Sequence, residues 1–167
     1  MKRPALKPGH LPDGVSFWHP VSLICTWFGS GLLPKIPGTW GSAAALPFAW
    51  VIQATGGAAG LAFAALALFA LGTAVSGTFA RWSGAKDPGA VVVDEVAAQW
   101  LTLAAGPLDP LSYLAGFVLF RIADVLKPWP ASWCERRFAG GLGVMADDMV
   151  SGVYSATALW LGSRWLV

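Results

Sequence analysis

Five of the nine acidic residues lie in or beside strongly apolar stretches of the chain. These residues are Asp94, Glu95, Asp124, Asp147 and Asp148. A charged carboxylate at the centre of a membrane helix costs on the order of 2.5 to 3.5 kcal/mol, so each one needs a partner. Oxygen ligands without a nearby histidine or cysteine suit Mg²⁺, Ca²⁺ or Mn²⁺ better than zinc or copper. The five acids therefore predict a divalent-cation site, if the fold brings them together.

A purely structural role would account for either acidic pair alone. Asp147 and Asp148 could cap the start of a helix, and Asp94 and Glu95 could end in the water of the headgroup layer. Capping is a weaker explanation for the whole set, because Asp124 forms a third group in another apolar stretch.

Two basic residues accompany Asp124 at intervals of three. Arg121, Asp124 and Lys127 therefore share one face of a predicted helix. Arginine and lysine beside carboxylates suit an anionic substrate, since a metal and side-chain cations together neutralise the charge of a phosphoryl group in its transition state. A salt-bridged helix end at the membrane surface would use the same residues.

A glycine-rich stretch with hydroxyl side chains, residues 36–42, directly precedes an apolar run. It contains Pro37, Gly38, Thr39 and Ser42. Free N–H groups at the start of a helix form a ready site for an anion such as phosphate. A loop that only caps a helix has the same composition, so this assignment depends on whether the fold places the stretch beside the carboxylates.

The composition is typical of a membrane protein. Hydrophobic residues make up 56% of the 167 residues, charged residues only 12%, and the mean hydropathy is +0.59. Because lipid cannot satisfy free backbone groups, we expect the apolar parts to be helices. The ten tryptophans suit interfacial aromatic belts, and a net charge of +2 with scattered basic residues argues against nucleic-acid binding.

Five apolar stretches predict an all-α fold, a polytopic membrane protein with about five transmembrane or half-spanning helices in one bundle. They cover residues 42–54, 56–80, 90–105, 111–125 and 149–161. The first two form a hairpin divided by Gly56 and Gly57, and the next two form another around the turn at 106–110. Residues 1–27 form a polar N-terminal segment, and residues 28–167 form the helical membrane domain.

Two hairpins bring the acids to one face of the membrane. Asp94 and Glu95 begin one predicted helix, and Asp124 ends the next. Asp147 and Asp148 begin the last helix. The same topology gathers ten of the eleven basic residues on this face, which the positive-inside tendency assigns to the cytoplasm. The ten are Lys2, Arg3, Lys7, Lys35, Arg81, Lys86, Arg121, Lys127, Arg136 and Arg137, with Arg164 opposite.

Four motifs occur in order along the chain. They are FGSGLLPKIPGTWGS (28–42), DPGAVVVDE (87–95), FRIADVLKPWP (120–130) and GGLGVMADDMVSG (140–152). In these motifs the chain resembles the phosphatidylglycerophosphatase A family of bacterial lipid phosphatases. The resemblance implies Mg²⁺-dependent hydrolysis of phosphatidylglycerophosphate, a lipid substrate, to phosphatidylglycerol and phosphate. It also implies a place in the bacterial inner membrane with the active site facing the cytoplasm, and no obligate protein partner is evident.

The resemblance also carries functional residues onto positions of this chain. We expect the five acids to bind metal, and the catalytic residues to be Asp94, Glu95, Asp124, Lys127 and Asp148. The residues expected to bind substrate are Pro37, Gly38, Thr39, Ser42, Arg121 and Lys127. One difference concerns Ala98, because the family commonly has a glycine two positions before the tryptophan that is Trp100 here.

In the expected mechanism, one or two Mg²⁺ ions polarise the phosphomonoester, and a carboxylate or an activated water supplies the attack. Lys127 and Arg121 hold the phosphoryl oxygens. A cation-coupled transporter or channel would also place carboxylates in membrane helices. Its pathway would need polar residues along the depth of the membrane, yet residues 56–80 and 149–161 offer only scattered serine and threonine. A structural membrane anchor would leave the acids without a role.

Overall fold

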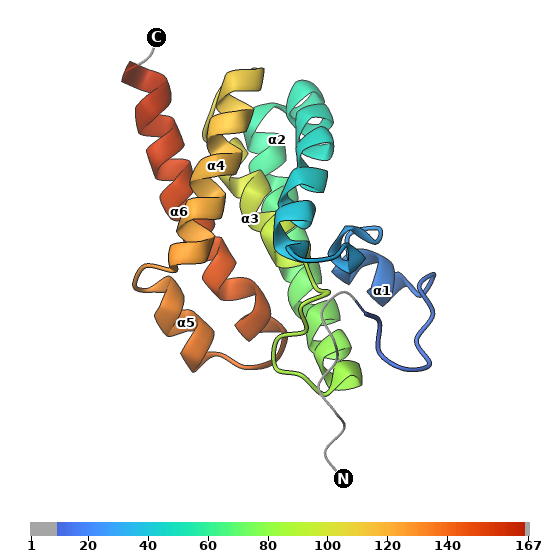
Figure 1. Cartoon of the computed structure of the whole chain (residues 1–167). Helices are drawn as coiled ribbons and strands as arrows, with labels where there is room; N and C mark the ends of the chain where they lie inside the picture. Colours follow the sequence, from blue (N-terminus) through green and yellow to red (C-terminus); the bar gives the residue numbers. More distant parts are fainter. Residues whose placement is uncertain (1–9, 166–167) are drawn as a thin grey trace.

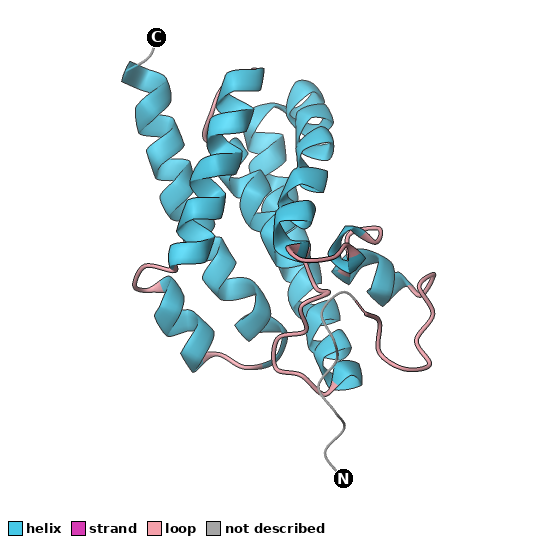
Figure 2. Cartoon of the chain, viewed as in Figure 1, coloured by secondary structure: helices cyan, strands magenta, loops and turns pink. Residues whose placement is uncertain are grey.

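The computed structural model describes residues 10–165, and all regular structure in this range is helical (Figures 1 and 2). The predicted all-α fold is therefore confirmed for the described residues, while Lys2, Arg3 and Lys7 lie outside them. The elements are α1 (Pro20–Cys25), the 3-10 turn η1 (Ser30–Leu32), α2 (Pro37–Ser83), α3 (Val93–Leu103), α4 (Pro110–Leu126), α5 (Ala131–Arg137) and α6 (Gly140–Trp165).

The long element α2 consists of two helical arms joined by a break at Gly57. Gly57 has φ 65° and ψ −173°, a backbone conformation that glycine adopts readily and other residues do not. The second arm runs back alongside the first (Figure 1), and both contribute to one core, with Ala45 and Ala49 from the first and Leu61 and Ala65 from the second. The hairpin predicted at this glycine pair is confirmed.

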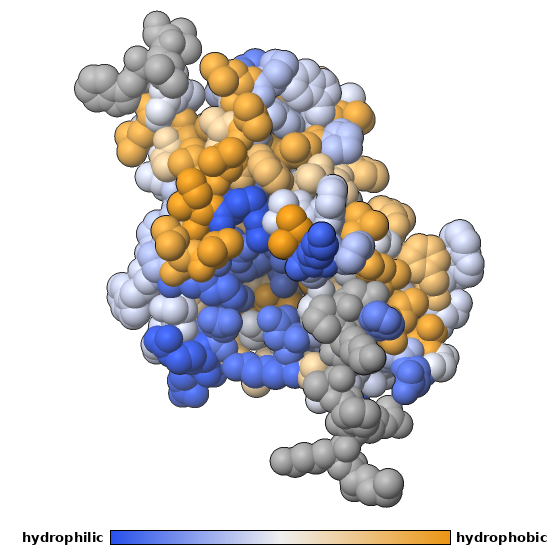
Figure 3. All heavy atoms as spheres, in the orientation of Figure 1, coloured by the Kyte–Doolittle hydropathy of each residue, from blue (hydrophilic) through white to orange (hydrophobic). Residues whose placement is uncertain are grey.

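Among the described helices, α2 is the one long and apolar enough to cross a membrane. Only 22% of its most apolar window is buried, whereas a core helix of a soluble protein would be mostly buried. Large apolar side chains are exposed on other helices too, including Leu111 and Val125 of α4. Apolar residues gather over the upper part of the face drawn in Figure 3 and hydrophilic residues over its lower part. The number of membrane crossings stays a prediction.

The short helix α3 lies at the centre of the bundle and packs against α2, α4 and α6 (Figure 1). Val93, Val96 and Ala97 are fully buried, and the indole N–H of Trp100 donates to the carbonyl of Ala45 at 3.0 Å. With 11 residues, α3 is about 16 Å long, roughly half of the hydrocarbon thickness. It is therefore a half-length helix whose N-terminal acids stay at one end of the bundle.

Residues before the predicted membrane domain also join this core. Cys25 ends α1 and is fully buried, and its carbonyl accepts a hydrogen bond of 2.8 Å from the N–H of Val92. Trp27 packs edge-on against both Phe48 and Trp100. The segment around α1 thus holds the loop that leads into α3.

The last helix begins earlier than expected, at Gly140 rather than at residue 149. The polar, glycine-rich stretch at residues 127–145, to which the apolar pattern assigned no helix, contains α5 and the start of α6. The glycines act as packing positions, since a Cβ on Gly141 would lie 1.7 Å from the carbonyl oxygen of Thr73 in α2. Asp147 and Asp148 consequently lie inside α6 and do not begin it.

A second glycine of α6, Gly152, packs against Ala98 of α3, the position at which this chain differs from the family pattern. A Cβ on Gly152 would lie 2.9 Å from the carbonyl oxygen and 3.2 Å from the Cβ of Ala98. The hydroxyl of Thr102 donates to the carbonyls of both Ala98 and Gly152, at 2.9 and 3.3 Å. Small residues allow helices to approach closely, and van der Waals contact of this kind holds membrane helices together.

The substitution Gly152→Ala should destabilise the bundle by about 1 to 3 kcal/mol, because the new methyl group overlaps the backbone of α3. The matched control is Gly162→Ala in the same helix, where an added Cβ meets nothing within 4 Å. It should be neutral or slightly stabilising, since alanine favours helix. Thermal unfolding in detergent, followed by circular dichroism, compares the two variants. Equal midpoints would contradict the close packing of α3 on α6.

Candidate active site

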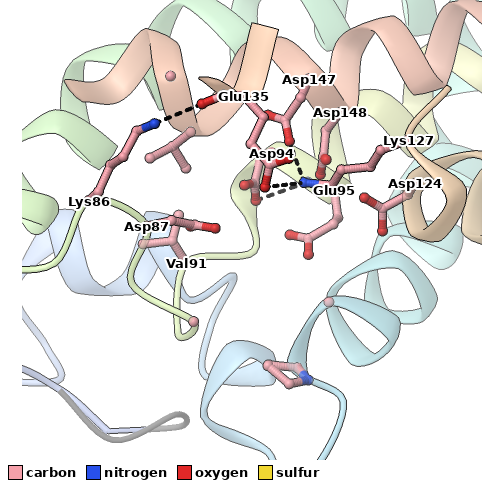
Figure 4. Close-up of a pocket in the computed structure, with 15 residues that line it drawn as sticks. Lys86, Asp87, Val91, Asp94, Glu95, Asp124, Lys127, Glu135, Asp147 and Asp148 are labelled. Atoms are coloured by element: carbon pink, nitrogen blue, oxygen red, sulfur yellow. Dashed lines mark hydrogen bonds and ion pairs between the residues drawn. The ribbon is translucent and has the colours of Figure 1, made fainter. Parts of the chain in front are cut away.

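The acidic residues meet in one cavity of about 210 Å³ (Figure 4). All five predicted acids line it, together with Pro37, Gly38 and Lys127. They come from four helices, since the cavity lies where α2 and α3 begin, where α4 ends and beside the third turn of α6. The predicted convergence of these distant segments is what the structure shows.

Three of the carboxylates come closest to one another. Oxygen atoms of Asp94, Glu95 and Asp148 all lie within 4.8 Å of one another. Asp94 and Asp148 are buried, and Oε2 of Glu95 is buried with no hydrogen-bond partner among the described residues. Buried polar atoms normally have a partner, so this oxygen points to a missing cation or donor. A set of three carboxylates fits a hard divalent cation such as Mg²⁺ or Ca²⁺.

Asp124 forms an ion pair with Arg121 of the same helix. Nη1 of Arg121 lies 2.8 Å from Oδ2 of Asp124 and donates to the hydroxyl of Ser42 at 3.3 Å. Thr39, Ser42 and Arg121 do not line the acidic cavity. Of the residues predicted to bind substrate, Pro37, Gly38 and Lys127 therefore line the cavity, whereas the other three do not.

Lys127 lines the cavity and links the end of α4 to α5 and α6. It caps α4 in a left-handed conformation with φ 42°, directly before Pro128, which cannot continue the helix. Its Nζ contacts Oδ2 of Asp147 at 2.5 Å and Oε1 of Glu135 at 3.3 Å. Burial opposes the charged form, but the hydrogen bond and charge of Asp147 raise the pKa of Lys127 above its usual range. The ammonium group therefore stays charged at neutral pH.

Asp147, like Asp124, differs from the other three predicted metal ligands because a basic side chain, here Lys127, already neutralises it. Its second oxygen, Oδ1, is buried and lacks a hydrogen-bond partner in the described part of the chain. Asp147 thus borders the group formed by Asp94, Glu95 and Asp148 while belonging to the Lys127 ion pair.

Three further charged residues line the cavity that were not among the predicted site residues. They are Lys86, Asp87 and Glu135. Nζ of Lys86 donates to the carbonyl of Glu135 at 2.8 Å, which joins the loop before α3 to α5. Burial, followed by the charge of Asp147, raises the pKa of Asp87. Asp87 begins the motif at 87–95, which was a usable signal, whereas Glu135 lies in a helix that apolar patterning did not reveal.

The charge balance of the cavity decides what it can bind. Seven carboxyl groups line it against two lysines. Like charges at this density repel one another and would also repel an anionic ligand. A bound divalent cation would reverse this local effect and allow a phosphate to approach. The cavity is therefore suited to a cation and a phosphate together.

Comparison with known proteins shows the family to which the chain belongs. A family profile described as "Phosphatidylglycerophosphatase A" matches residues 23–163. The chain is 40% identical over 150 residues to phosphatidylglycerophosphatase A of Escherichia coli K12, covering 89% of this chain and 85% of that one. It is 34% identical over 155 residues to the protein of that name from Haemophilus influenzae, covering 92% and 94%. A relative from Bacteroides thetaiotaomicron is 36% identical over 180 residues, covering 100% of this chain and 99% of that one. It carries the provisional name phosphatidylinositol-3-phosphatase. No solved structure matches significantly.

The variant Gly38→Ala tests whether Glu95 is a metal ligand. An added Cβ would lie 2.1 Å from Oε1 of Glu95, so the flexible carboxylate must move away while the fold is kept. We expect the affinity for Mg²⁺ or Mn²⁺ to fall by roughly tenfold to a hundredfold, as when ligand-orienting contacts are lost. Titration of the thermal unfolding midpoint with either ion measures this. Gly60→Ala, where nothing lies within 4 Å, is the control. Unchanged affinity in Gly38→Ala would remove Glu95 from the ligand set.

Proposed function

Because the chain belongs to the phosphatidylglycerophosphatase A family and is a phosphatase, we propose that it hydrolyses phosphatidylglycerophosphate to phosphatidylglycerol and phosphate with the help of Mg²⁺. The observation that carries this proposal is the convergence of Asp94, Glu95 and Asp148 within 4.8 Å, in a cavity that also contains Lys127. The carboxylates would hold the cation, and Lys127 would bind the terminal phosphate of the lipid beside it.

Each part of the cavity has a task in this reaction. Asp94, Glu95 and Asp148 would hold Mg²⁺, which acts as a Lewis acid toward the phosphoryl group when it is bound. Lys127 is kept charged and in place by Asp147 and donates to a phosphoryl oxygen. Asp87 and Asp124 also line the cavity, and a carboxylate there can accept the proton of the attacking water.

The placement of charges supports an active site at the cytoplasmic face of the inner membrane. The basic residues Arg136 and Arg137 end α5, and Lys86 contacts the same helix, so all three lie at the end of the bundle that holds the acidic cavity. Arg164 lies in the last turn of α6, far along that helix from Asp148. This asymmetry follows the positive-inside tendency.

The substrate headgroup and the class of activity both need a direct test. Two relatives carry the name of the proposed activity and the third is named for another phosphorylated lipid, so an assay should offer phosphatidylglycerophosphate and phosphatidylinositol 3-phosphate side by side. Faster phosphate release from the first supports the proposal.

The family is one of phosphatases, which favours this activity over the transporter alternative. Ion flux in liposomes without phosphate release would reverse that preference.

Removal of divalent cations should abolish activity. With the purified protein in detergent, excess EDTA should reduce phosphate release from phosphatidylglycerophosphate to the background rate, because the uncompensated carboxylates repel the phosphate. Added Mg²⁺ should restore it. Phosphate release that continues at full rate in EDTA would refute the role of the metal.

The variants Asp148→Asn and Asp124→Asn should each lower kcat by at least about a hundredfold, the loss expected when several kcal/mol of transition-state stabilisation are removed. Neither should unfold the protein, since each removes one charge from a crowded acidic cavity. Asp109→Asn is a matched control, because Asp109 caps α4 and does not line the cavity, and asparagine caps equally well. Full activity in Asp148→Asn would show that the three-carboxylate group is not the catalytic centre.

A further inference from the structure

A groove on the outer face of α4 lies next to the acidic cavity. It has a volume of about 480 Å³ and is lined by Thr39, Phe117, Val118, Arg121, Ile122, Val125 and Leu126. Most of its wall is apolar, and Val125 is 73% exposed. Its only charged lining residue is Arg121, and its only hydroxyl is that of Thr39.

Arg121 lines the groove and contacts a residue that lines the cavity. Its Nη1 lies 2.8 Å from Oδ2 of Asp124, a residue that lines the cavity. A Cβ built on Gly38, another cavity residue, would lie 3.3 Å from the same nitrogen. The groove therefore begins where the cavity ends, with a guanidinium group at the junction.

Two other apolar grooves on the described surface lack this arrangement. One is lined by Leu46, Pro47, Trp50, Pro110, Tyr113 and Leu114. The other is lined by Pro47, Phe48, Val51 and Ile52. Neither has a charged lining residue, and neither shares a residue with the cavity or with the groove at Arg121.

We propose that the groove at Arg121 seats an acyl chain of the lipid substrate and that Arg121 contacts the phosphodiester of the same molecule. This inference rests on the proposed function. The substrate carries a terminal phosphomonoester and, one glycerol unit away, a phosphodiester that leads to the acyl chains. The order of cavity, guanidinium and apolar groove matches this order of groups. The lipid thus enters sideways from the membrane, between the start of α2 and α4.

The groove contributes alignment more than affinity. An acyl chain in a bilayer is already surrounded by hydrocarbon, so its transfer into an apolar groove gains little from the hydrophobic effect. A seated chain and a bound phosphodiester instead fix the direction from which the terminal phosphate reaches the carboxylates. Misplacement of a reacting group by about 1 Å can cost a hundredfold in rate.

The variant Val118→Trp fills the groove and tests the proposal. The assay compares long-chain phosphatidylglycerophosphate with its deacylated headgroup, glycerophosphoglycerophosphate, which is soluble. We expect kcat/KM for the lipid to fall by at least about tenfold, with the soluble compound changed by less than about twofold. Val51→Trp, in an apolar groove that does not adjoin the cavity, makes the same side-chain change and should leave both reactions unchanged.

The outcomes separate this proposal from the proposed function. If Val118→Trp leaves the lipid reaction intact, slows both substrates equally, or behaves like Val51→Trp, the groove does not seat the chain. If the wild-type protein releases phosphate from neither compound, the proposed function itself fails. Equal thermal unfolding midpoints of the two tryptophan variants establish that both are folded.

A second variant tests the contact with the phosphodiester. Arg121→Gln also disturbs Asp124, which should slow every substrate to a similar extent. Glycerophosphoglycerophosphate should lose at least about tenfold more than glycerol 3-phosphate, which has no phosphodiester, because a charge-assisted hydrogen bond is lost only with the former. Equal losses for the two compounds would overturn the assignment of Arg121 to the phosphodiester.

Discussion

Repulsion between buried carboxylates is the constraint on which the site depends. Asp94, Glu95 and Asp148 place oxygens within 4.8 Å of one another, and Asp94 and Asp148 are buried. Two neighbouring acids are already neutralised, Asp147 by Lys127 and Asp124 by Arg121. The three central carboxylates lack such a partner, so they are stable together when they are protonated or share a cation. A bound divalent cation would turn this unfavourable arrangement into a binding site.

Close helix packing is what brings the acids so near to one another. Gly141 lies against the backbone of α2 and Gly152 against that of α3, and larger residues at either position would push α6 and its acids outward. At the start of α2, the absence of a side chain on Gly38 leaves room for the carboxylate of Glu95. The motif glycines thus set the distance between the elements that carry the chemistry, while the acids themselves would favour separation.

Much of this arrangement could be predicted from the sequence because long apolar segments leave strong signals. The hairpin at Gly57 and the positions of Asp94 and Asp124 at helix ends follow from apolar segment lengths and turn residues. The start of α6 could not be predicted, because its glycines are typical of a loop and their packing against α2 is visible only in the structure. Sequence spacing also does not reveal which side chains on one helical face line the cavity. Arg121 shares a helical face with Asp124 and Lys127, yet it lines the outer groove and not the cavity.

Buried polar atoms without a partner on α3 weaken the fold around the site. Gln99 lies one helical turn beyond Glu95 on the same face, is fully buried, and has no hydrogen-bond partner for either amide atom among the described residues. A buried polar group without a partner costs about 1 to 3 kcal/mol, and Glu95 adds a second. Because a cation that binds only the folded state stabilises it in proportion to its concentration, metal binding would offset part of this cost. Folding and catalysis would then depend on the same ion, since Glu95 has an unpartnered buried oxygen and is also one of the proposed ligands.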